Sequence, residues 1–375
     1  MKRRNFLMGL AGVGVAGVLS ACSSTRTTGG SSPSGTAGGA GALIGIAMPT
    51  KSLERWNRDG AHLEELLKAA GYQTSLQYAD NKQDQQNNQL QNMINEGAKV
   101  LVVASIDGTA LGPTLQQAAG KGIKVIAYDR LINGSPNVDY YATFDNYKVG
   151  TLQGQYILDN MASFKGSDGK INLEPFAGSP DDNNAKFFFS GAWDLLLPKV
   201  QDGTFTVPSG KAPKSDADWT SIGVPAWSSA TAQSEMQNRL NSFYTGGKKV
   251  NIVLSPNDSL ALGIEQALDG AGYKTGVDWP LVTGQDADLA NVKNMLAGKQ
   301  SMTVWKDTRK LGDQVAKMVD QIIQNKTVDV NDTKTYDNGV KVVPTYLLDP
   351  QVVTKDTVKS VLVDSGFYTA SQLGL

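Results

Sequence analysis

The sequence predicts an α/β fold of two doubly wound lobes, and two observations carry this prediction. From about residue 43 onward, short runs rich in Val, Ile and Leu alternate with longer segments whose apolar residues recur at helical spacing. The short runs are almost continuously hydrophobic, as expected for parallel strands with helices on both faces of the sheet. The segment from Leu43 to Leu375 is long enough for two domains of ordinary size.

Three strands are predicted in the first half of this segment, over the runs "LIGIAM", "KVLVVASIDG" and "IKVIAYDR". Apolar residues spaced i, i+3, i+4 and i+7 follow the first strand and indicate one helix face: Leu63, Leu66, Leu67 and Ala70. Similar helical patterns precede the other two strands. The first half is therefore interpreted as one lobe.

The same alternation returns in the second half, where "KINLEPFAGSPDDNN", "TSIGVPAWSSATAQ" and "NIVLSPND" each lead into a helical pattern. The helix after the first run carries several large apolar residues: Phe188, Phe189, Trp193 and Leu196. Because Trp193 lies in the middle of this pattern, we interpret it as a core residue. A second lobe similar to the first is expected.

Residues 1–21 are predicted to be a lipoprotein signal peptide. They begin with basic residues, continue with an apolar stretch and end in "LSA" before Cys22, which resembles a bacterial lipobox and implies that Cys22 becomes the lipidated N-terminus. Arg3 and Arg4 also resemble a twin-arginine export signal, and an ordinary export signal with a chance arginine pair stays open. The apolar stretch is shorter than the ~20 residues of a spanning helix.

Residues 22–42 are rich in Ser, Gly and Thr and offer little apolar surface to bury. Such a composition is typical of a flexible tether. With a lipid on Cys22, the tether would hold the folded body beside the membrane. We therefore expect an extracytoplasmic protein, periplasmic or on the outer face of the cell membrane, that is attached only by its lipid.

Composition excludes several classes of function. The formal net charge is −1, with 35 Lys and Arg against 36 Asp and Glu, whereas nucleic-acid binding requires a basic surface. Because Cys22 and His62 are the only Cys and His, the sequence predicts no disulfide framework, no Cys/His metal site and no triad with a cysteine nucleophile. A triad with a histidine base would require His62. No cofactor and no calcium loop are expected, since "SDGK" at 167–170 offers too few oxygen ligands.

Polar and aromatic residues gather where the predicted strands end. They are Lys51 to Trp56, Asp107, Asp129-Arg130, Asp181 to Asn184, Trp227, Asn257-Asp258 and Gln285-Asp286. In open α/β sheets this edge is where ligands bind. Asp and Asn after a strand can instead cap the next helix, and for Asp258 the two interpretations are equally open. Capping explains neither the tryptophans nor the arginines.

These residue types fit a monosaccharide. Carboxylates and amides accept hydrogen bonds from hydroxyl groups, while Arg and Lys donate to them, and a charged partner makes the bond about twice as strong as a neutral one. Trp56 and Trp227 offer flat apolar faces to the C–H patches of a sugar ring. For Trp227, which lies between "GVPA" and a predicted helix start, a place in a core is as open as a place in a cleft.

Several motifs in order make the chain similar to a known family: "IGIAMPTKSLERW", "IKVIAYDRLI", "FAGSPDDNNA", "VTGQDAD" and "WKDTR". The segment from Leu43 to Leu375 resembles the periplasmic sugar-binding proteins of ATP-binding-cassette (ABC) importers, in the branch that binds xylose, galactose, arabinose and glucose. The resemblance implies two Rossmann-like lobes, a three-stranded hinge and one aldose between the lobes. It also implies a permease as partner, whereas a chemoreceptor or sensor kinase as a further partner stays open.

The resemblance assigns ligand contacts to individual residues. From the first lobe these are Arg55, Trp56, Asp129 and Arg130. From the second lobe they are Asn183, Asn184, Trp227, Asp258 and Asp286, with Lys51 and Lys306 as weaker assignments. Arg58 is expected on the solvated face of its helix. The segment 200–226 is longer and richer in Pro and Gly than the family suggests, so the register into Trp227 stays open.

The expected division of the chain is discontinuous. The first lobe should comprise residues 43–136 and 304–336, and the second residues 137–303 and 337–375, because "SMTVWKDTR" and "VKVVPTYLLDP" resemble a second and a third crossing between the lobes.

Other classes of function stay open beside the transport receptor. A glycosidase would need two carboxylates at a defined spacing across a scissile bond, and the clustered Asp residues alone do not indicate this. A sugar-responsive repressor would need a helix-turn-helix motif ahead of the first lobe, where only the signal and tether are expected. A receptor of the same fold for another small polar ligand, or a sugar sensor that feeds chemotaxis or two-component signalling, is the remaining alternative.

Overall fold

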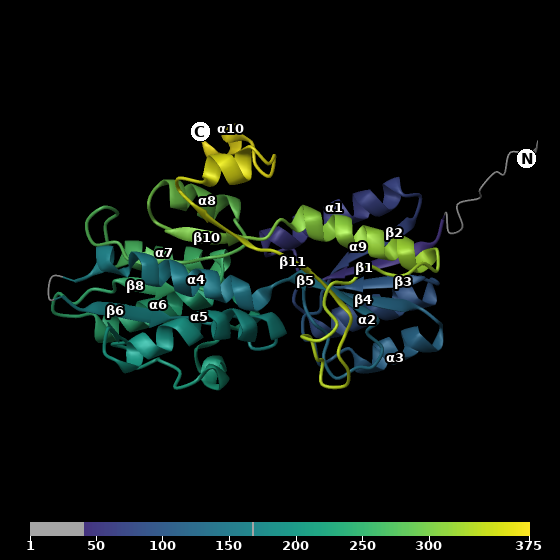
Figure 1. Ribbon diagram of the computed structural model, residues 1–375, viewed down its shortest axis with the longest axis horizontal. Coiled ribbons are helices and arrows are strands. Elements are labelled where there is room, and N and C mark those ends of the chain that lie inside the picture. Colours follow the sequence, from purple (N-terminus) through teal and green to yellow (C-terminus); the bar gives the residue numbers. More distant parts are fainter. Residues whose placement is uncertain (1–40, 167–168) are drawn as a thin grey trace, which may run out of the picture. The chain divides into compact units, whose positions relative to one another are not determined.

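The computed structural model describes residues 41–166 and 169–375 (Figure 1). The predicted signal peptide, Cys22 and nearly all of the tether lie outside the described residues. Within the described part of the chain, no helix is both long and apolar enough to cross a membrane.

The first lobe is built on a six-stranded sheet in the order β11-β5-β4-β3-β1-β2. Its strands are β1 (Leu43–Met48), β2 (Gln73–Tyr78), β3 (Val100–Val103), β4 (Lys124–Tyr128), β5 (Tyr140–Phe144) and β11 (Thr345–Leu348), all paired in parallel. Helices α1 (Glu54–Ala69) and α9 (Thr308–Ile323) cover one face, and α2 (Gln83–Asn95) and α3 (Gly112–Gly120) cover the other (Figure 1).

Alternation along each strand explains this double coverage. Val100 and Val102 of β3 pack toward α1 and α9, whereas Leu101 and Val103 pack toward α2 and α3. Because successive side chains of a strand point to opposite faces, a strand buried on both faces must be apolar throughout. The continuous hydrophobic runs predicted from the sequence are confirmed as parallel strands.

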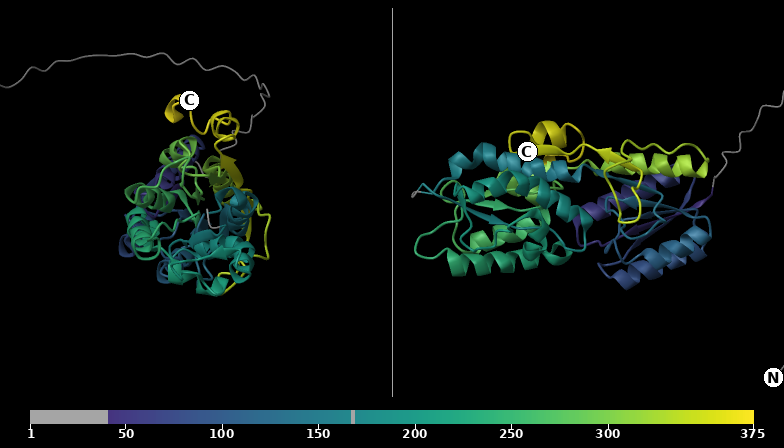
Figure 2. Two further views of the ribbon diagram at one scale, coloured as in Figure 1. Left: turned by 90° about the vertical axis from the view of Figure 1, so that its left-hand side faces the viewer. Right: turned by 60° about the horizontal axis from the view of Figure 1, so that its bottom comes forward.

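The second lobe contains a four-stranded parallel sheet in the order β7-β6-β8-β9. Its strands are β6 (Ile171–Pro175), β7 (Phe205–Thr206), β8 (Ile252–Leu254) and β9 (Leu281–Val282), and an antiparallel pair, β10 (Met302–Trp305) with β12 (Gln351–Thr354), accompanies them. The helices are α4 (Asn146–Asn160), α5 (Asn183–Gln201), α6 (Ser229–Phe243), α7 (Asp258–Gly270), α8 (Leu289–Leu296) and α10 (Ala370–Leu373). Helix α10 lies beside α8 of this lobe (Figure 1), and the two further views show the same chain from other sides (Figure 2).

Four short helical segments complete the second lobe. Three are 3-10 helices, at Met161–Phe164, Asp216–Ile222 and Pro225–Trp227, and the fourth is a π-helix at Lys359–Val363. The segment 200–226, which looked long in the sequence, contains β7 and the 3-10 helix Asp216–Ile222. Trp193 is fully buried in the core of this lobe, which confirms its predicted packing role.

The chain passes between the two lobes three times, which confirms the predicted three-stranded hinge. The passages join β5 to α4, β10 to α9, and β11 to β12. The predicted boundaries need correction, however. Those at 136/137 and 336/337 lie ahead of β5 and β11, which pair with each other and complete the first sheet. The boundary at 303/304 falls inside β10, which pairs with β12 of the second lobe.

Candidate ligand-binding site

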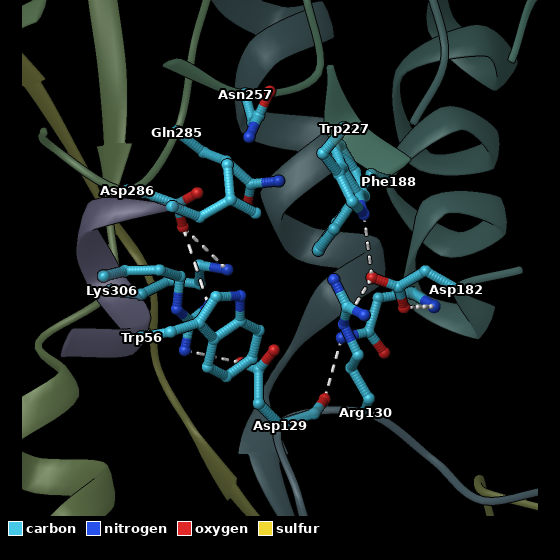
Figure 3. Close-up of a pocket in the computed structure, with 13 residues that line it drawn as sticks. Trp56, Asp129, Arg130, Asp182, Phe188, Trp227, Asn257, Gln285, Asp286 and Lys306 are labelled. Atoms are coloured by element: carbon cyan, nitrogen blue, oxygen red, sulfur yellow. Dashed lines mark hydrogen bonds and ion pairs between the residues drawn. The ribbon is translucent and has the colours of Figure 1, made fainter. Parts of the chain in front are cut away.

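A cavity of about 300 Å³, counting its mouth, lies between residues of the two lobes (Figure 3). Eight residues that the sequence assigned to ligand binding line it: Arg55, Trp56, Asp129, Arg130, Asn184, Trp227, Asp286 and Lys306. The residues converge because most of them follow the carboxyl ends of β1, β4, β6, β8, β9 and β10 or lie in the helices after these strands, while Trp227 directly precedes α6.

Arg55 forms the charged centre of the first-lobe wall. It stands in the first turn of α1, and its guanidinium lies 2.7 Å from Asp59, 3.1 Å from Asp129 and 3.7 Å from Asp286. Burial alone would raise the pKa of Asp129, but the charges of Arg55, Lys306 and Arg130 hold this pKa below its usual value. Asp129 is therefore an ionised acceptor at neutral pH.

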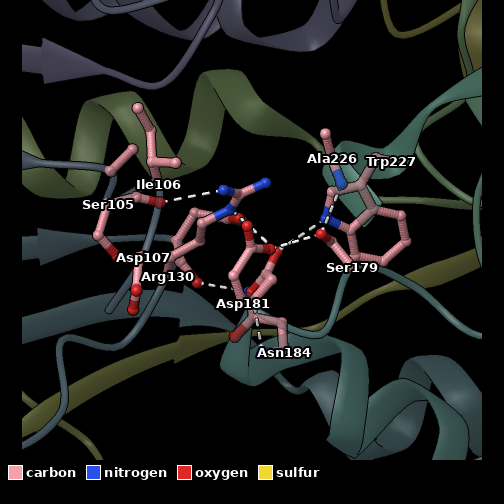
Figure 4. A network of polar contacts seen from close by, with 12 residues as sticks. Ser105, Ile106, Asp107, Arg130, Ser179, Asp181, Asn184, Ala226 and Trp227 are labelled. Atoms are coloured by element: carbon pink, nitrogen blue, oxygen red, sulfur yellow. Dashed lines mark hydrogen bonds and ion pairs between the residues drawn. The ribbon is translucent and has the colours of Figure 1, made fainter. Parts of the chain in front are cut away.

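Arg130 links the first lobe to the second (Figure 4). Its Nε lies 2.9 Å from Asp182 Oδ2, and its Nη1 donates to the Ser105 carbonyl at 3.0 Å. Asp182 also caps α5 by accepting from the Asn184 backbone N–H at 2.9 Å. Burial, with Asp129 nearby, raises the pKa of Asp182 in spite of Arg130.

Aromatic rings form the apolar part of the cavity. Trp56 has the guanidinium carbons of Arg55 and Arg130 at 4.4 and 5.2 Å from its ring centroid. Trp227 and Phe188 meet edge to face, with centroids 6.3 Å apart. Trp227 combines the two places left open by the sequence, since it packs in the second-lobe core and also lines the cavity, while only 5% exposed.

Trp227 is held from several directions. Its indole N–H donates to Asp182 Oδ2 at 3.2 Å, and its carbonyl accepts from the Ser259 hydroxyl at 3.0 Å. On another side of the ring lies Gly178, where any Cβ would overlap the six-membered ring. The indole of Trp227 therefore packs directly on the backbone of Gly178, and only glycine leaves room for it there. Trp227 and Phe188 are called the aromatic wall of the cavity below.

Three lining residues have left-handed backbones, with φ of 61° at Asp129, 53° at Trp227 and 97° at Asp286. Such conformations are uncommon for residues other than Gly and tend to cluster at functional sites. At Asp129 the carbonyl accepts from Thr143 Oγ1 at 3.0 Å and from Asn184 Nδ2 at 2.7 Å. These bonds keep the turn in place and leave the carboxylate directed toward Arg55.

Three predicted ligand residues do not line the cavity, and the structure corrects their assignment. Lys51 is exposed, with its ammonium 4.9 Å from the centroid of the Tyr78 ring. Asn183 precedes Asn184 on α5, so its side chain leaves the helix about 100° away. Asp258 is fully buried behind the cavity wall, where it accepts from the backbone N–H of Asp288 and from the side chains of Gln300 and Thr303.

Five further residues complete the lining: Leu53, Asp182, Phe188, Asn257 and Gln285. Asp182, Asn257 and Gln285 belong to the polar strand ends seen in the sequence, but nothing in the sequence ranked them above their neighbours. Phe188 lies four residues after Asn184 and so on the same face of α5. Among the described residues, the buried Trp56 Nε1, Arg55 Nε and Gln285 Oε1 have no hydrogen-bond partner in the protein, which is expected of groups that serve a ligand.

Comparison with known proteins agrees with this architecture. Residues 44–327 match the periplasmic binding protein domain family. The multiple sugar-binding periplasmic receptor ChvE of Rhizobium radiobacter is 50% identical over 331 residues, covering 88% of this chain and 92% of the relative. The D-xylose-binding periplasmic protein of Escherichia coli is 35% identical over 330 residues, covering 88% and 92%.

Solved structures give the same result. An ABC transporter solute-binding protein of Clostridium phytofermentans with bound β-D-glucose is 52% identical and superposes with a TM-score of 0.82, covering 88% of this chain and 99% of that chain. A carbohydrate transporter solute-binding protein of Chloroflexus aurantiacus in complex with D-glucose is 35% identical, with a TM-score of 0.79 and coverages of 88% and 97%. The chain therefore belongs to the periplasmic binding protein family, in its sugar-binding branch.

Proposed function

We propose that the protein captures one neutral aldose, a pentose or hexose, in the cavity between its lobes and delivers it to the permease of an ABC importer. As a member of a family of binding proteins it is a receptor and not an enzyme, and it works outside the cytoplasm. The glucose-bound structures and the multiple-sugar and xylose receptors among its relatives support an aldose as ligand.

The charge balance of the cavity is the observation that carries the proposal. Three cations, Arg55, Arg130 and Lys306, face three carboxylates, Asp129, Asp182 and Asp286, and none of these six side chains is more than 10% exposed. Each cation already has a lining carboxylate within 3.1 Å. A sugar adds hydroxyls that accept from the cations and donate to the carboxylates without disturbing these pairs.

The same balance weighs against the alternative ligand, an amino acid or another charged molecule. Its carboxylate or ammonium would need an unpaired partner of opposite charge, and would have to break one of the buried pairs to obtain it, which costs several kcal/mol. The aromatic rings of Trp56 and Trp227 favour a ligand with C–H faces. We therefore infer that charged sugars and amino acids bind far more weakly than neutral aldoses.

Calorimetric titration of the purified Cys22→Ser protein with glucose, galactose, xylose and arabinose tests the proposal. Gluconate and glutamate serve as charged comparisons. Asp286→Ala should weaken every aldose by roughly fivefold to a hundredfold, because it strands buried donors at a cost of about 1 to 3 kcal/mol. Asp129→Asn should penalise the aldoses unequally, since it replaces an ionised acceptor by an amide.

Asp313→Ala is the matched control, because Asp313 is 59% exposed on α9 and lies outside the cavity. The absence of aldose binding by the parent would refute the proposed function. Parent-like binding by both site variants would instead show that the cavity is not the sugar site.

We also propose that Cys22, which lies outside the described residues, carries a lipid that anchors the protein. The lipobox and the tether support this proposal. In cells, Cys22→Ser should release the protein into the soluble fraction or stop its maturation. Membrane retention with normal maturation would contradict lipidation. A chemoreceptor or sensor kinase is proposed as a further partner of the sugar-bound form.

A further inference from the structure

Arg58 lies one helical turn after Arg55 on α1, but it does not line the cavity. The sequence predicted a place for Arg58 on the solvated face of the helix, and the structure contradicts this prediction. Its Nη1 lies 2.6 Å from both Glu54 Oε1 and the Tyr368 hydroxyl, and its Nη2 lies 3.5 Å from Asp288 Oδ1. With 26% of its side chain exposed, Arg58 is an interlobe residue.

Two arginine–aspartate pairs thus join α1 to the same short segment of the second lobe. The inner pair, Arg55 with Asp286 at 3.7 Å, stands in the cavity wall. The outer pair, Arg58 with Asp288 at 3.5 Å, stands outside it. Because residues three apart on a helix share a face, α1 can present both arginines to residues two apart in the segment. The outer pair therefore bridges the lobes without reaching the ligand.

The C-terminal segment strengthens this outer contact. The ring centroid of Phe367 lies 4.9 Å from the guanidinium carbon of Arg58 on α1 and 5.3 Å from that of Arg309 on α9. Arg309 Nη1 also donates to the Ser365 carbonyl at 3.0 Å. Both arginines belong to helices of the first lobe, whereas Phe367 packs on the core of the second. Cation–π contacts of this kind are attractive, and more so where water is excluded.

Tyr368 completes the cluster. Its hydroxyl lies 2.9 Å from the Ala287 carbonyl and 3.2 Å from Glu54 Oε1, and its ring belongs to the second-lobe core with Trp305 and Leu362. The backbone N–H of Leu289 also donates to Glu54 Oε2 at 3.3 Å. Each of these polar contacts of Glu54 is made with the second lobe.

Arg58 is the cation that pairs with the two carboxylates at this contact, Glu54 and Asp288. Burial, together with the charges of Asp286 and Glu54, raises the pKa of Asp288 to about 7, although Arg58 and Arg55 lower it. Loss of Arg58 would remove this positive charge, and Asp288 would take up a proton or face Glu54 without a counter-charge. In either case the attraction between the lobes at this point would be lost.

We propose that Arg58, Phe367 and Tyr368 form a clasp that holds the two lobes together and so sets how long any bound ligand stays, without touching it. The proposal rests on the proposed function, in which the ligand is an aldose. In a protein that closes around its ligand, contacts made only between closed lobes shift the equilibrium toward the closed state. The clasp residues are positioning residues that act on all aldoses equally.

Stopped-flow measurement of tryptophan fluorescence separates binding from release. Arg58→Gln, Phe367→Ala and Tyr368→Phe should each raise the dissociation rate by about threefold to tenfold and leave the association rate within about twofold. The factor should be the same for glucose, galactose and xylose. Tyr368→Phe is the mildest of the three changes. If urea unfolding gives it the same free energy of unfolding as the parent, its higher dissociation rate is not a result of lower stability.

Two matched controls have the same chemistry within one lobe. Lys68→Gln removes a pair with Glu64 at 3.0 Å on α1, and Tyr147→Phe removes a phenol bond to Asp194 at 2.6 Å within the second lobe. Neither should change the dissociation rate. Clasp variants that release sugar at the control rate would overturn the proposal, and a factor that depends on the sugar would show that Arg58 contacts the ligand.

A second measurement does not require sugar binding. In the Cys22→Ser protein, which has no other cysteine, spin labels at Lys326→Cys and Lys248→Cys report the distance between the lobes. Without ligand, Arg58→Gln should shift the distance distribution toward longer values than in the parent. An unchanged distribution would overturn the clasp, whereas failure of every aldose to bind the parent would refute only the proposed function.

Discussion

The substitution Gly178→Ala tests whether the position of the Trp227 ring determines the affinity for sugar. It lies in the buried segment after β6, and a Cβ placed on it would overlap the six-membered ring of Trp227. Its backbone is outside the left-handed region, so the main chain itself tolerates alanine. Gly178→Ala therefore changes one thing, the position of the indole.

The magnitude follows from what fixes the indole. A small displacement would have to break or stretch the 3.2 Å bond from Trp227 to Asp182 and would disturb the edge contact with Phe188. Overpacking a well-packed site costs about 1 to 3 kcal/mol. If this strain is relieved by moving the indole into the cavity, the lost affinity is roughly fivefold to a hundredfold. Every aldose should lose a similar factor, because the hydrogen-bonding groups stay in place.

Calorimetry of Gly178→Ala with four aldoses measures this loss, and urea unfolding measures the accompanying change in stability. Gly112→Ala is the control, since a Cβ at Gly112 meets nothing within 4 Å. If Gly178→Ala binds aldoses like the control, Trp227 is not part of the binding surface. If it binds some aldoses normally and others weakly, Trp227 is a selective contact rather than a uniform wall.

Three further predictions concern buried charges. Burial raises the pKa of Glu265 from 4.5 to about 8, so the folded state loses stability as pH rises between these values; Glu265→Gln should unfold like the parent at pH 4.5 and be more stable by on the order of 2 to 4 kcal/mol at pH 8 in urea titrations. Arg239→Met strands Glu174, which lies 3.0 Å from Arg239, and should cost about 3 to 5 kcal/mol in the same assay, with the added change Glu174→Gln restoring part of the loss. Asp258→Asn should leave aldose selectivity unchanged in calorimetry, because burial keeps the pKa of Asp258 well above its usual value and a neutral carboxyl resembles an amide; altered selectivity would return Asp258 to the site.

The fold was predictable because its signals are local. Strands such as β1, β3 and β4 are continuous apolar runs, and the helices between them show regular apolar spacing. Once the strands are known to be parallel, their carboxyl ends must meet, which is why Arg55, Asp129 and Asp286 could be placed in one cavity. The boundaries of the lobes were less accessible, because β5 and β11 are hardly distinguishable in sequence from connecting segments.

Side-chain direction was beyond the reach of the sequence. Asn257 and Asp258 are neighbours after the same strand, yet the first lines the cavity and the second is buried behind it. Arg58 has the spacing of an exposed helix residue, and only contact with a segment more than 200 residues away gives it another role. Local patterns contain no information about such distant partners.

The left-handed residues show why the walls of the cavity are in place before a ligand arrives. Asp129, Trp227 and Asp286 each adopt a backbone that their own side chains disfavour, and each is held there by neighbours. The Asp129 carbonyl accepts from Thr143 and Asn184, the N–H of Ala226 beside Trp227 donates to Ser179 Oγ at 2.7 Å, and the N–H of Ala287 beside Asp286 donates to Thr303 Oγ1 at 3.2 Å. Since these bonds lie within the protein, folding supplies the free energy of the strained conformations. A sugar then binds to acceptors and a ring that are already in position. Because little free energy is needed to order these groups, more of the interaction energy appears as affinity.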